Sequence, residues 1–216
     1  MMGENYKKGT TTIGVICKDG VVLAADKRAS MGYLIANKEV DKIFKITDDI
    51  ALTIAGVAAD GQKLAEILSA EMELYEMRTD TKPNLTVASN LMSNILFGRA
   101  KSFLPYIVQL ILGGRDKDNT YGLFTQDPSG SNIKESKFHT TGSGSPMAFG
   151  VLENDYKENM SIDEGVKLAI RAISSALKRD MATGEGVDVI VIDNKGFRRI
   201  EKSKIGSMLK VNEINT

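Results

Sequence analysis

The N-terminal part of the chain consists of short β-rich runs separated by turn residues. Residues 10–17 and 21–26 form two such runs, separated by Lys18-Asp19-Gly20, in which Asp-Gly supplies the positive φ of a hairpin turn. We therefore predict two paired strands at the start of the chain. Three more short strands are predicted at residues 33–36, 43–46 and 50–54.

A helical period replaces the strand pattern after these runs. Apolar residues recur every three or four positions and share one face of a helix expected over residues 57–77, with Glu71 the polar exception. Lys82-Pro83-Asn84 then breaks the chain, and a second helix is expected over residues 85–101. Two consecutive helices thus follow the first strands.

Strands return in the second half of the chain. We predict them at residues 106–112 and 121–126, joined by a polar turn over residues 113–119. The continuous β-branched run 187–192 is typical of a strand that is buried on both faces. His139, beside Phe138, is also expected to lie in a strand.

A helix is predicted between these strands. Ser161 and Glu164 have the spacing of a capping box, and an apolar stripe follows them to about Lys178-Arg179. The whole order is strands, two helices, strands, two helices, strands. Helices do not alternate with single strands, so the pattern predicts an α+β layered fold and a single domain.

Charge and composition narrow the range of functions. Lys and Arg together number 28, as do Asp and Glu, so the formal net charge is zero and nucleic acid is not expected as a partner. The chain has one cysteine, Cys17, and one histidine, His139, which excludes a disulfide framework and a His-rich zinc site. Cys17 is interpreted as a core residue and His139 as a structural one. A Ser-His-Asp triad would have to include His139.

Other ligand classes are not expected either. The N-terminal residues are polar and the longest apolar runs are too short for a bilayer, so we expect a cytoplasmic protein without membrane contact. Gly142-Ser143-Gly144 has no Lys-Ser/Thr after it, which argues against a nucleotide site. No cofactor and no metal are expected.

Candidate chemistry gathers near the first strands. Thr10, Thr11 and Thr12 open the first strand, and three threonines alone would indicate no more than β-propensity. Asp26 and Arg28 end the second strand, however, and Lys42 begins a later one. An acid, two bases and several hydroxyls at neighbouring strand ends could form a polar site at one edge of a sheet.

These residues belong to a series of motifs that resembles the β-type subunits of the proteasome core particle, of the archaeal type with one catalytic β subunit. The resemblance covers nearly the whole chain. Its motifs are, in order, Gly9-Thr10-Thr11-Thr12-Ile13-Gly14-Val15, Val22-Leu23-Ala24-Ala25-Asp26-Lys27-Arg28, Val40-Asp41-Lys42-Ile43, Ala55-Gly56-Val57-Ala58-Ala59-Asp60, Gly142-Ser143-Gly144-Ser145, Ala148-Phe149-Gly150-Val151-Leu152 and Lys178-Arg179-Asp180.

The resemblance implies a fold and an activity. The expected fold is the four-layer αββα sandwich of N-terminal-nucleophile hydrolases, in which two antiparallel sheets are flanked by helices. The expected activity is that of a threonine endopeptidase, which degrades unfolded proteins to short peptides inside a closed chamber. Residues 1–9 would be a propeptide and residues 10–216 the catalytic domain. Cleavage between Gly9 and Thr10 would free an α-amine, whose pKa of about 7.7–8.0 lets it accept a proton.

The family's roles are carried over to matching positions. Thr10 would be the nucleophile, and Lys42 would lie beside it to relay its proton and keep the amine pKa low by charge repulsion. Asp26 would pair with Lys42, and the N–H of Gly56 would stabilise the oxyanion. Arg28 would have a structural role near the site.

Ser143 and Asp180 would complete the network around the amine. Thr183 stands where many members of the family have serine, and its hydroxyl is expected to keep the network. The resemblance also implies an apolar, roomy pocket that favours cleavage after large hydrophobic residues. Its expected lining is Ala29, Val40, Phe44, Ile54 and Ala58.

Assembly is implied by the resemblance as well. A homo-heptameric β ring would stack on a second β ring, with α-type proteasome subunits outside and a hexameric AAA-type ATPase bound through the α ring. Two alternatives are a non-catalytic scaffold subunit of the ring and the bacterial two-ring relative of the proteasome. A scaffold would be expected to lack Thr10, Lys42 or Asp26. The bacterial relative has a shorter chain, and its second strand does not end in Asp-Lys-Arg.

Overall fold

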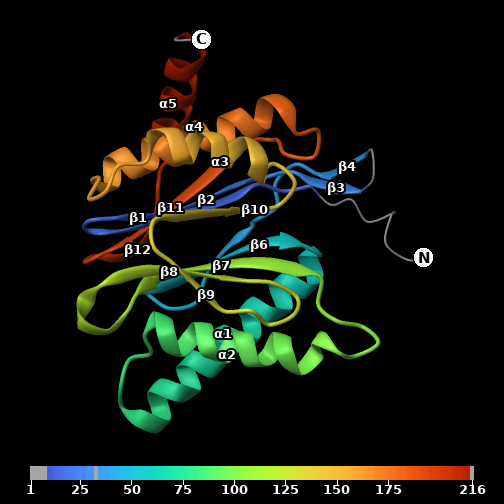
Figure 1. Cartoon of the computed structure of the whole chain (residues 1–216), viewed down its shortest axis with the longest axis vertical. Helices are drawn as coiled ribbons and strands as arrows, with labels where there is room; N and C mark the ends of the chain where they lie inside the picture. The colour runs from blue at the N-terminus through green and yellow to red at the C-terminus, as the bar shows by residue number, and fades with distance from the viewer. Residues whose placement is uncertain (1–8, 32–33, 215–216) are drawn as a thin grey trace.

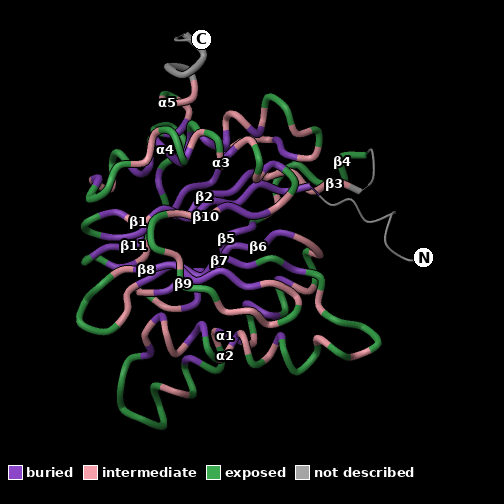
Figure 2. Tube along the Cα trace, in the orientation of Figure 1, coloured by how far each residue is buried: buried purple, intermediate pink, exposed green. Residues whose placement is uncertain are grey.

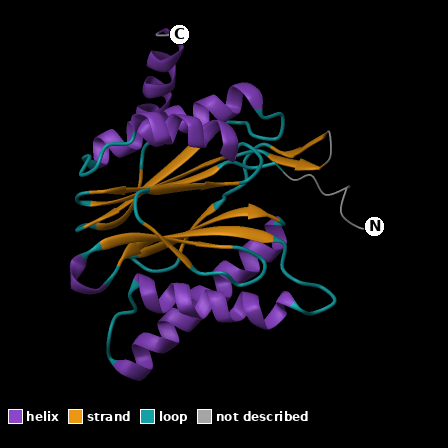
Figure 3. Ribbon diagram, in the orientation of Figure 1, coloured by secondary structure: helices purple, strands orange, loops and turns teal. Residues whose placement is uncertain are grey.

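Two antiparallel five-stranded sheets lie face to face in the computed structural model, with helices covering the outer face of each (Figures 1 and 3). The structure describes residues 9–31 and 34–214. The predicted α+β class and the four-layer αββα sandwich are confirmed.

Each sheet has a simple order. The first sheet contains, from edge to edge, β10 (Phe138–Thr141), β1 (Thr12–Cys17), β2 (Gly20–Asp26), β11 (Val187–Asp193) and β12 (Gly196–Arg199). The second contains β5 (Ile43–Lys45), β6 (Ile50–Gly56), β7 (Val108–Arg115), β8 (Tyr121–Gln126) and β9 (Ile133–Glu135). A hairpin of β3 (Ala29–Met31) and β4 (Leu34–Asn37) extends from the end of β2.

The helices form the two outer layers. The second sheet is covered by α1 (Ala58–Thr79) and α2 (Leu85–Ala100). The first sheet is covered by α3 (Ser145–Asp155) and α4 (Ile162–Arg179), and the C-terminal helix α5 (Lys202–Ile214) packs beside α4. None of the helices in these described segments combines the length and apolar composition that a bilayer span requires.

The alternation of side chains along β2 shows how the layers are held together. Val21, Leu23 and Ala25 point into the core between the sheets, whereas Val22 and Ala24 pack in the core beneath α4. The predicted two-sided burial of β11 is confirmed in the same way, because every residue of that strand is buried. Figure 2 shows that buried residues are concentrated in the strands of both sheets, between the two outer helical layers.

Most predicted elements are present, with a shift of a residue or two at their ends. One prediction is wrong: residues 113–115 continue β7 instead of forming a turn, and the turn is confined to a short 3-10 segment, Lys117–Asn119. Gly113 and Gly114 are needed for space. A Cβ atom on Gly114 would lie 2.3 Å from the backbone oxygen of Asp49, the residue just before the neighbouring strand β6.

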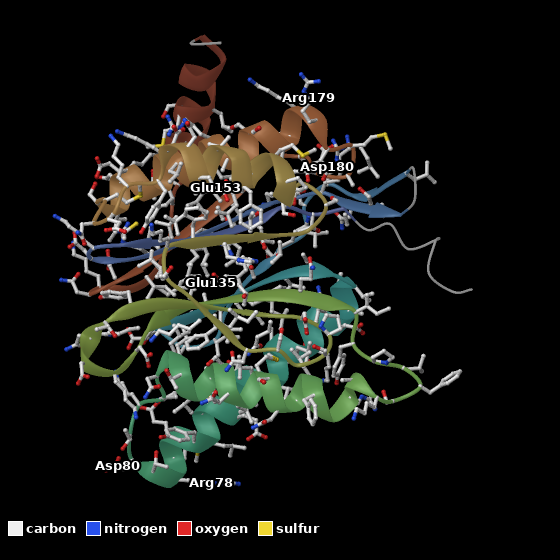
Figure 4. The ribbon with its side chains drawn as sticks, in the orientation of Figure 1. Arg78, Asp80, Glu135, Glu153, Arg179 and Asp180 are labelled. Carbon is white, nitrogen blue, oxygen red and sulfur yellow. The ribbon has the colours of Figure 1, made fainter. Side chains whose placement is uncertain are left out.

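The start and the end of α4 determine where Asp180 lies. The capping box predicted for Ser161 and Glu164 is confirmed, and it sets the start of α4. The helix then ends at Arg179, so that Asp180 caps it close to the start of β1 (Figure 4). The sequence did not place α3, which begins directly after Gly144.

Candidate active site

Thr10 lies just before β1 and is only 5% exposed. Its hydroxyl donates a hydrogen bond to the carbonyl oxygen of Gly9, with 2.7 Å between the two oxygens. A Cβ atom on Gly9 would stand 1.5 Å from that of Ala182, so a larger residue cannot occupy this position without a shift of the backbone. The candidate nucleophile therefore contacts the carbonyl group of the bond whose cleavage would free its own nitrogen. Residues 1–8 of the predicted propeptide lie outside the described residues.

Asp26, at the end of β2, is buried, and both of its carboxylate oxygens accept hydrogen bonds. One carboxylate oxygen accepts hydrogen bonds from Lys42 Nζ at 2.7 Å and from the N–H of Thr11 at 3.0 Å. The other accepts from the N–H groups of Arg28 at 3.2 Å and Gly184 at 2.9 Å. Backbone groups thus hold Asp26 in place, and Asp26 holds Lys42.

Lys42 is buried with its ammonium group against Asp26. Burial lowers the pKa of Lys42, and the neighbouring Asp26 carboxylate acts in the opposite direction. Lys42 and Thr10 border the same cavity, although the hydrogen bond that Lys42 donates goes to Asp26. A lysine whose pKa is lowered can exchange a proton more easily than an exposed one.

Ser143 and Asp180 flank Thr10 on the other side. The N–H of Thr10 donates to Ser143 Oγ at 3.3 Å, and Ser143 Oγ donates to Asp180 Oδ2 at 2.5 Å. Thr183 Oγ1 donates to the same Asp180 oxygen at 2.5 Å, and it lies 2.7 Å from Thr11 Oγ1. A chain of hydroxyl groups therefore ends at the nitrogen that would become the α-amine.

Gly56 borders the cavity at the end of β6, directly before α1. Its φ is +126°, and a Cβ atom here would lie 2.3 Å from the backbone oxygen of Ile107. Glycine is therefore required at this turn. Gly56 and Thr10 line the same cavity.

The chain is similar in sequence to proteins of a known family. The family described as Proteasome subunit matches residues 6–192. The chain belongs to the proteasome subunit family. It is 46% identical to the proteasome subunit beta of Methanosarcina thermophila, over 96% of this chain and 97% of the relative. It is 48% identical to the proteasome subunit beta of Methanopyrus kandleri, over 95% of this chain and 98% of the relative.

These relatives make the chain a β-type proteasome subunit, as its motifs predicted. A proteasome is a protease, so the reaction to be explained is the hydrolysis of peptide bonds. Its β-type subunits assemble in rings together with α-type subunits.

A cavity of about 190 Å³ opens beside Thr10. All five predicted pocket residues line it, so the structure brings them together with the proteasome's candidate nucleophile. The sequence missed Gln62 and Asp41, which also border the cavity. Gln62 lies four residues after Ala58 on α1, and this helical spacing is a signal that could have identified it.

Arg28 lines the cavity beside Thr10 and is bonded to the loop that follows Asp180. Its guanidinium donates to the carbonyl oxygen of Met181 at 2.9 Å and to Glu185 at 3.3 Å. Gly184 leaves the space for it, because a Cβ atom there would stand 2.2 Å from Arg28 Cζ. Arg28 therefore connects the end of β2 to the loop that carries Thr183.

His139 and Cys17 lie away from Thr10. His139 Nδ1 is 3.0 Å from a carboxylate oxygen of Glu135, and its ring packs edge-on against Phe149. Ser143 makes its hydrogen bonds with Thr10 and Asp180, so the described contacts give no Ser-His pair. Cys17 is buried in the core, where burial raises the pKa of its thiol to about 12, as expected for a structural residue.

Proposed function

We propose that this proteasome subunit is a threonine endopeptidase in which Thr10 is the nucleophile after cleavage of the Gly9–Thr10 bond. The observation that carries the proposal is the 2.7 Å contact between the Thr10 hydroxyl and the Gly9 carbonyl oxygen, next to the buried Asp26–Lys42 pair. Residues 1–9 would be the propeptide and residues 10–216 the catalytic domain.

The first step would release the propeptide. Thr10 Oγ adds to the carbonyl carbon of Gly9 and gives up its proton, and the C–N bond between the two residues breaks. The nitrogen keeps the electron pair and takes up a proton, so that an amine and an ester form. Water then hydrolyses the ester, leaving a carboxylate on Gly9 and the hydroxyl on Thr10.

The second reaction would use the amine as a base. Thr10 Oγ attacks the scissile carbonyl of a substrate while its proton passes to the amine, with Lys42 as relay. The N–H of Gly56 stabilises the negative oxygen of the tetrahedral intermediate. The proton then moves to the leaving amine of the substrate, and water hydrolyses the remaining ester. No cofactor or metal takes part in this scheme.

The cavity beside Thr10 would bind the substrate side chain that precedes the cleaved bond. Ala29, Val40, Phe44, Ile54 and Ala58 offer it apolar walls, and burial of apolar area favours large hydrophobic residues. Asp41 at the cavity is paired with Arg199 at 3.4 Å, so its charge is partly compensated.

Membership of the proteasome subunit family supports a proposal for the particle in which this reaction would occur. We propose two stacked homo-heptameric β rings flanked by α-type rings in the cytoplasm, with a hexameric AAA-type ATPase that delivers unfolded polypeptides. Exposed apolar side chains offer surface for contacts between subunits: Phe103 is 95% exposed, Leu104 73% and Leu34 67%. Mass measurement of the assembled particle tests the ring size.

The two alternatives have less support. A non-catalytic scaffold would have no reason to keep a buried Asp26–Lys42 pair beside Thr10 and an apolar cavity. The bacterial two-ring relative is disfavoured by the near full-length match to archaeal proteasome beta subunits.

Replacement of Thr10 tests the proposal. In Thr10→Ala, propeptide removal and peptide hydrolysis should both be lost while particles with α-type subunits still assemble, because one hydroxyl performs both reactions. Thr10→Ser should retain part of both. An alanine variant that still removes its own propeptide in isolated particles would assign the chemistry to another residue, with Ser143 or Ser145 and His139 next to be examined.

A further inference from the structure

Thr11 and Thr12 are neighbours in the sequence, are both fully buried, and enter two separate groups of hydroxyls. Thr11 Oγ1 lies 2.7 Å from Thr183 Oγ1. Thr12 Oγ1 lies 2.7 Å from Thr141 Oγ1 and accepts a hydrogen bond from Thr53 of the second sheet at 3.1 Å. Only the first of these groups reaches Asp180.

Counting protons fixes the direction of the hydrogen bonds around Asp180. A carboxylate oxygen accepts only, so Thr183 directs its single hydroxyl proton to Asp180 Oδ2. Ser143 does the same, because Asp180 Oδ2 is 2.5 Å from its hydroxyl oxygen and the other acceptor, the carbonyl oxygen of Thr10, is 3.5 Å away. The oxygen of Thr183 can then only accept from Thr11, and Thr11 must be the donor. The oxygen of Ser143 likewise accepts from the N–H of Thr10. Two donor chains converge on one carboxylate, one from Thr10 and one from Thr11.

Gly144 leaves the space that the Thr11 hydroxyl occupies. A Cβ atom on Gly144 would stand 2.0 Å from Thr11 Oγ1 and 3.1 Å from Thr183 Oγ1, so that a side chain there would displace the Thr11 hydroxyl. The backbone of Thr11 is anchored as well, because its N–H donates to Asp26 at 3.0 Å. Thr11 thereby joins the Asp26–Lys42 pair to the hydroxyl chain on the opposite side of Thr10.

We propose that Thr11 is a positioning residue for the threonine-protease reaction, which rests on the proposed function. Its hydroxyl donates to Thr183 and so holds the Thr183 side chain in the rotamer that bonds to Asp180. Asp180 in turn fixes Ser143 with its oxygen directed at the Thr10 nitrogen. Thr11 does not border the cavity beside Thr10, so its effect falls on the chemical step and not on substrate binding.

Thr11→Val tests this, with Thr12→Val as the matched control, since valine keeps the shape and replaces the hydroxyl with a methyl group. We expect kcat for a fluorogenic peptide with leucine before the cleaved bond to fall roughly fivefold to tenfold in Thr11→Val, with KM unchanged. Thr12→Val should keep kcat within about twofold in assembled particles. Thr11→Ser should restore kcat, because serine supplies the same donor.

A double variant sharpens the test. If Thr11 acts through Thr183, then Thr11→Val should add little to the loss in Thr183→Ala. Equal kcat in Thr11→Val and Thr12→Val, or independent losses that multiply in the double variant, would overturn the proposal. Should Thr11→Val fail to assemble, Thr11→Ala and Thr11→Ser replace it, since only the serine variant should remain fast.

The two proposals fail in different ways. Activity retained by Thr10→Ala would overturn the proposed function itself. An inactive Thr10→Ala together with a fully active Thr11→Val would leave the proposed function intact and reject the positioning role alone.

Discussion

Thr10 lies between two groups of side chains that are held in different ways. On one side, Asp26 and Lys42 form a buried ion pair, and three backbone N–H groups fix the Asp26 carboxylate. On the other side, Ser143, Asp180 and Thr183 are joined mainly through their own hydroxyls, and Ser143 is exposed. We call them the charged flank and the hydroxyl flank.

The difference indicates how each flank tolerates change. A buried charge that loses its partner is left unpaired in a medium of low polarity, which is costly and has no simple repair. In the hydroxyl flank, water can replace the exposed Ser143 hydroxyl at little cost, whereas loss of the buried Thr183 hydroxyl removes one hydrogen bond and leaves no charge unpaired. We therefore expect substitutions in the charged flank to abolish activity and substitutions in the hydroxyl flank to reduce it.

The largest effect is expected for Lys42. Lys42→Ala should lower kcat by roughly 10²–10⁴-fold, because proton relay is lost, while rings still form. Lys42→Arg should lower kcat as well, since a guanidinium does not release its proton near neutral pH. Lys45→Ala is the control, as Lys45 is exposed and pairs with Asp48. Activity in Lys42→Ala equal to that of the control would place the proton relay elsewhere.

Asp26→Asn should impair both activity and folding. The amide leaves the Lys42 ammonium buried without its counter-charge, and breaking such a pair costs about 3–5 kcal/mol of stability. Unfolding by denaturant would measure the loss, and peptide hydrolysis would report activity. The exposed pair of Arg199 and Asp41 offers a comparison: Asp41→Asn should cost less than about 1 kcal/mol. Similar losses in both variants would contradict the assignment of a buried charged flank.

Thr183 tests the hydroxyl flank. Thr183→Ser should have a kcat close to that of the unchanged protein, because the hydroxyl that bonds to Asp180 remains. Thr183→Ala should lower kcat by roughly tenfold, the equivalent of one hydrogen bond. A loss in Thr183→Ala as large as that in Lys42→Ala would remove the distinction between the flanks.

The charged flank could be predicted from the sequence more directly than the hydroxyl flank. Asp26 and Lys42 lie at the ends of short strands, where the β-rich pattern is clear and the motif is local. Ser143 and Asp180 meet only because α3 and α4 return the chain to the start of β1, and α3 was not placed from the sequence. Family resemblance, not periodicity, identified that pair.

The hydrogen-bond partners of individual side chains could not be predicted from the sequence. Thr10, Thr11 and Thr12 are the same residue type in a row, and nothing in the pattern assigns Thr11 to Thr183 and Thr12 to Thr53. The glycines of β7 were misread for a related reason. Gly113 and Gly114 resemble a turn in sequence, whereas the close approach of neighbouring strands that requires them exists only in the folded sheets.

The smallest effect on catalysis is expected for His139, which belongs to neither flank. Burial lowers the pKa of His139 below its usual 6.5, with Glu135 opposing, so the folded protein favours neutral histidine. The free energy of unfolding should therefore fall as the pH drops below about 6.5. In His139→Gln this decline should be shallower, with peptide hydrolysis at neutral pH nearly unchanged. A strong loss of peptide hydrolysis in His139→Gln would instead indicate that His139 acts as a catalytic base.

The N-terminus of the assembled, active particle tests the central claim most directly. Intact mass and N-terminal sequencing of this β subunit should show the loss of residues 1–9 and a chain that begins at Thr10, because only then is the amine beside the nucleophile free. A particle with full peptide hydrolysis whose β subunit still begins at Met1 would contradict the account.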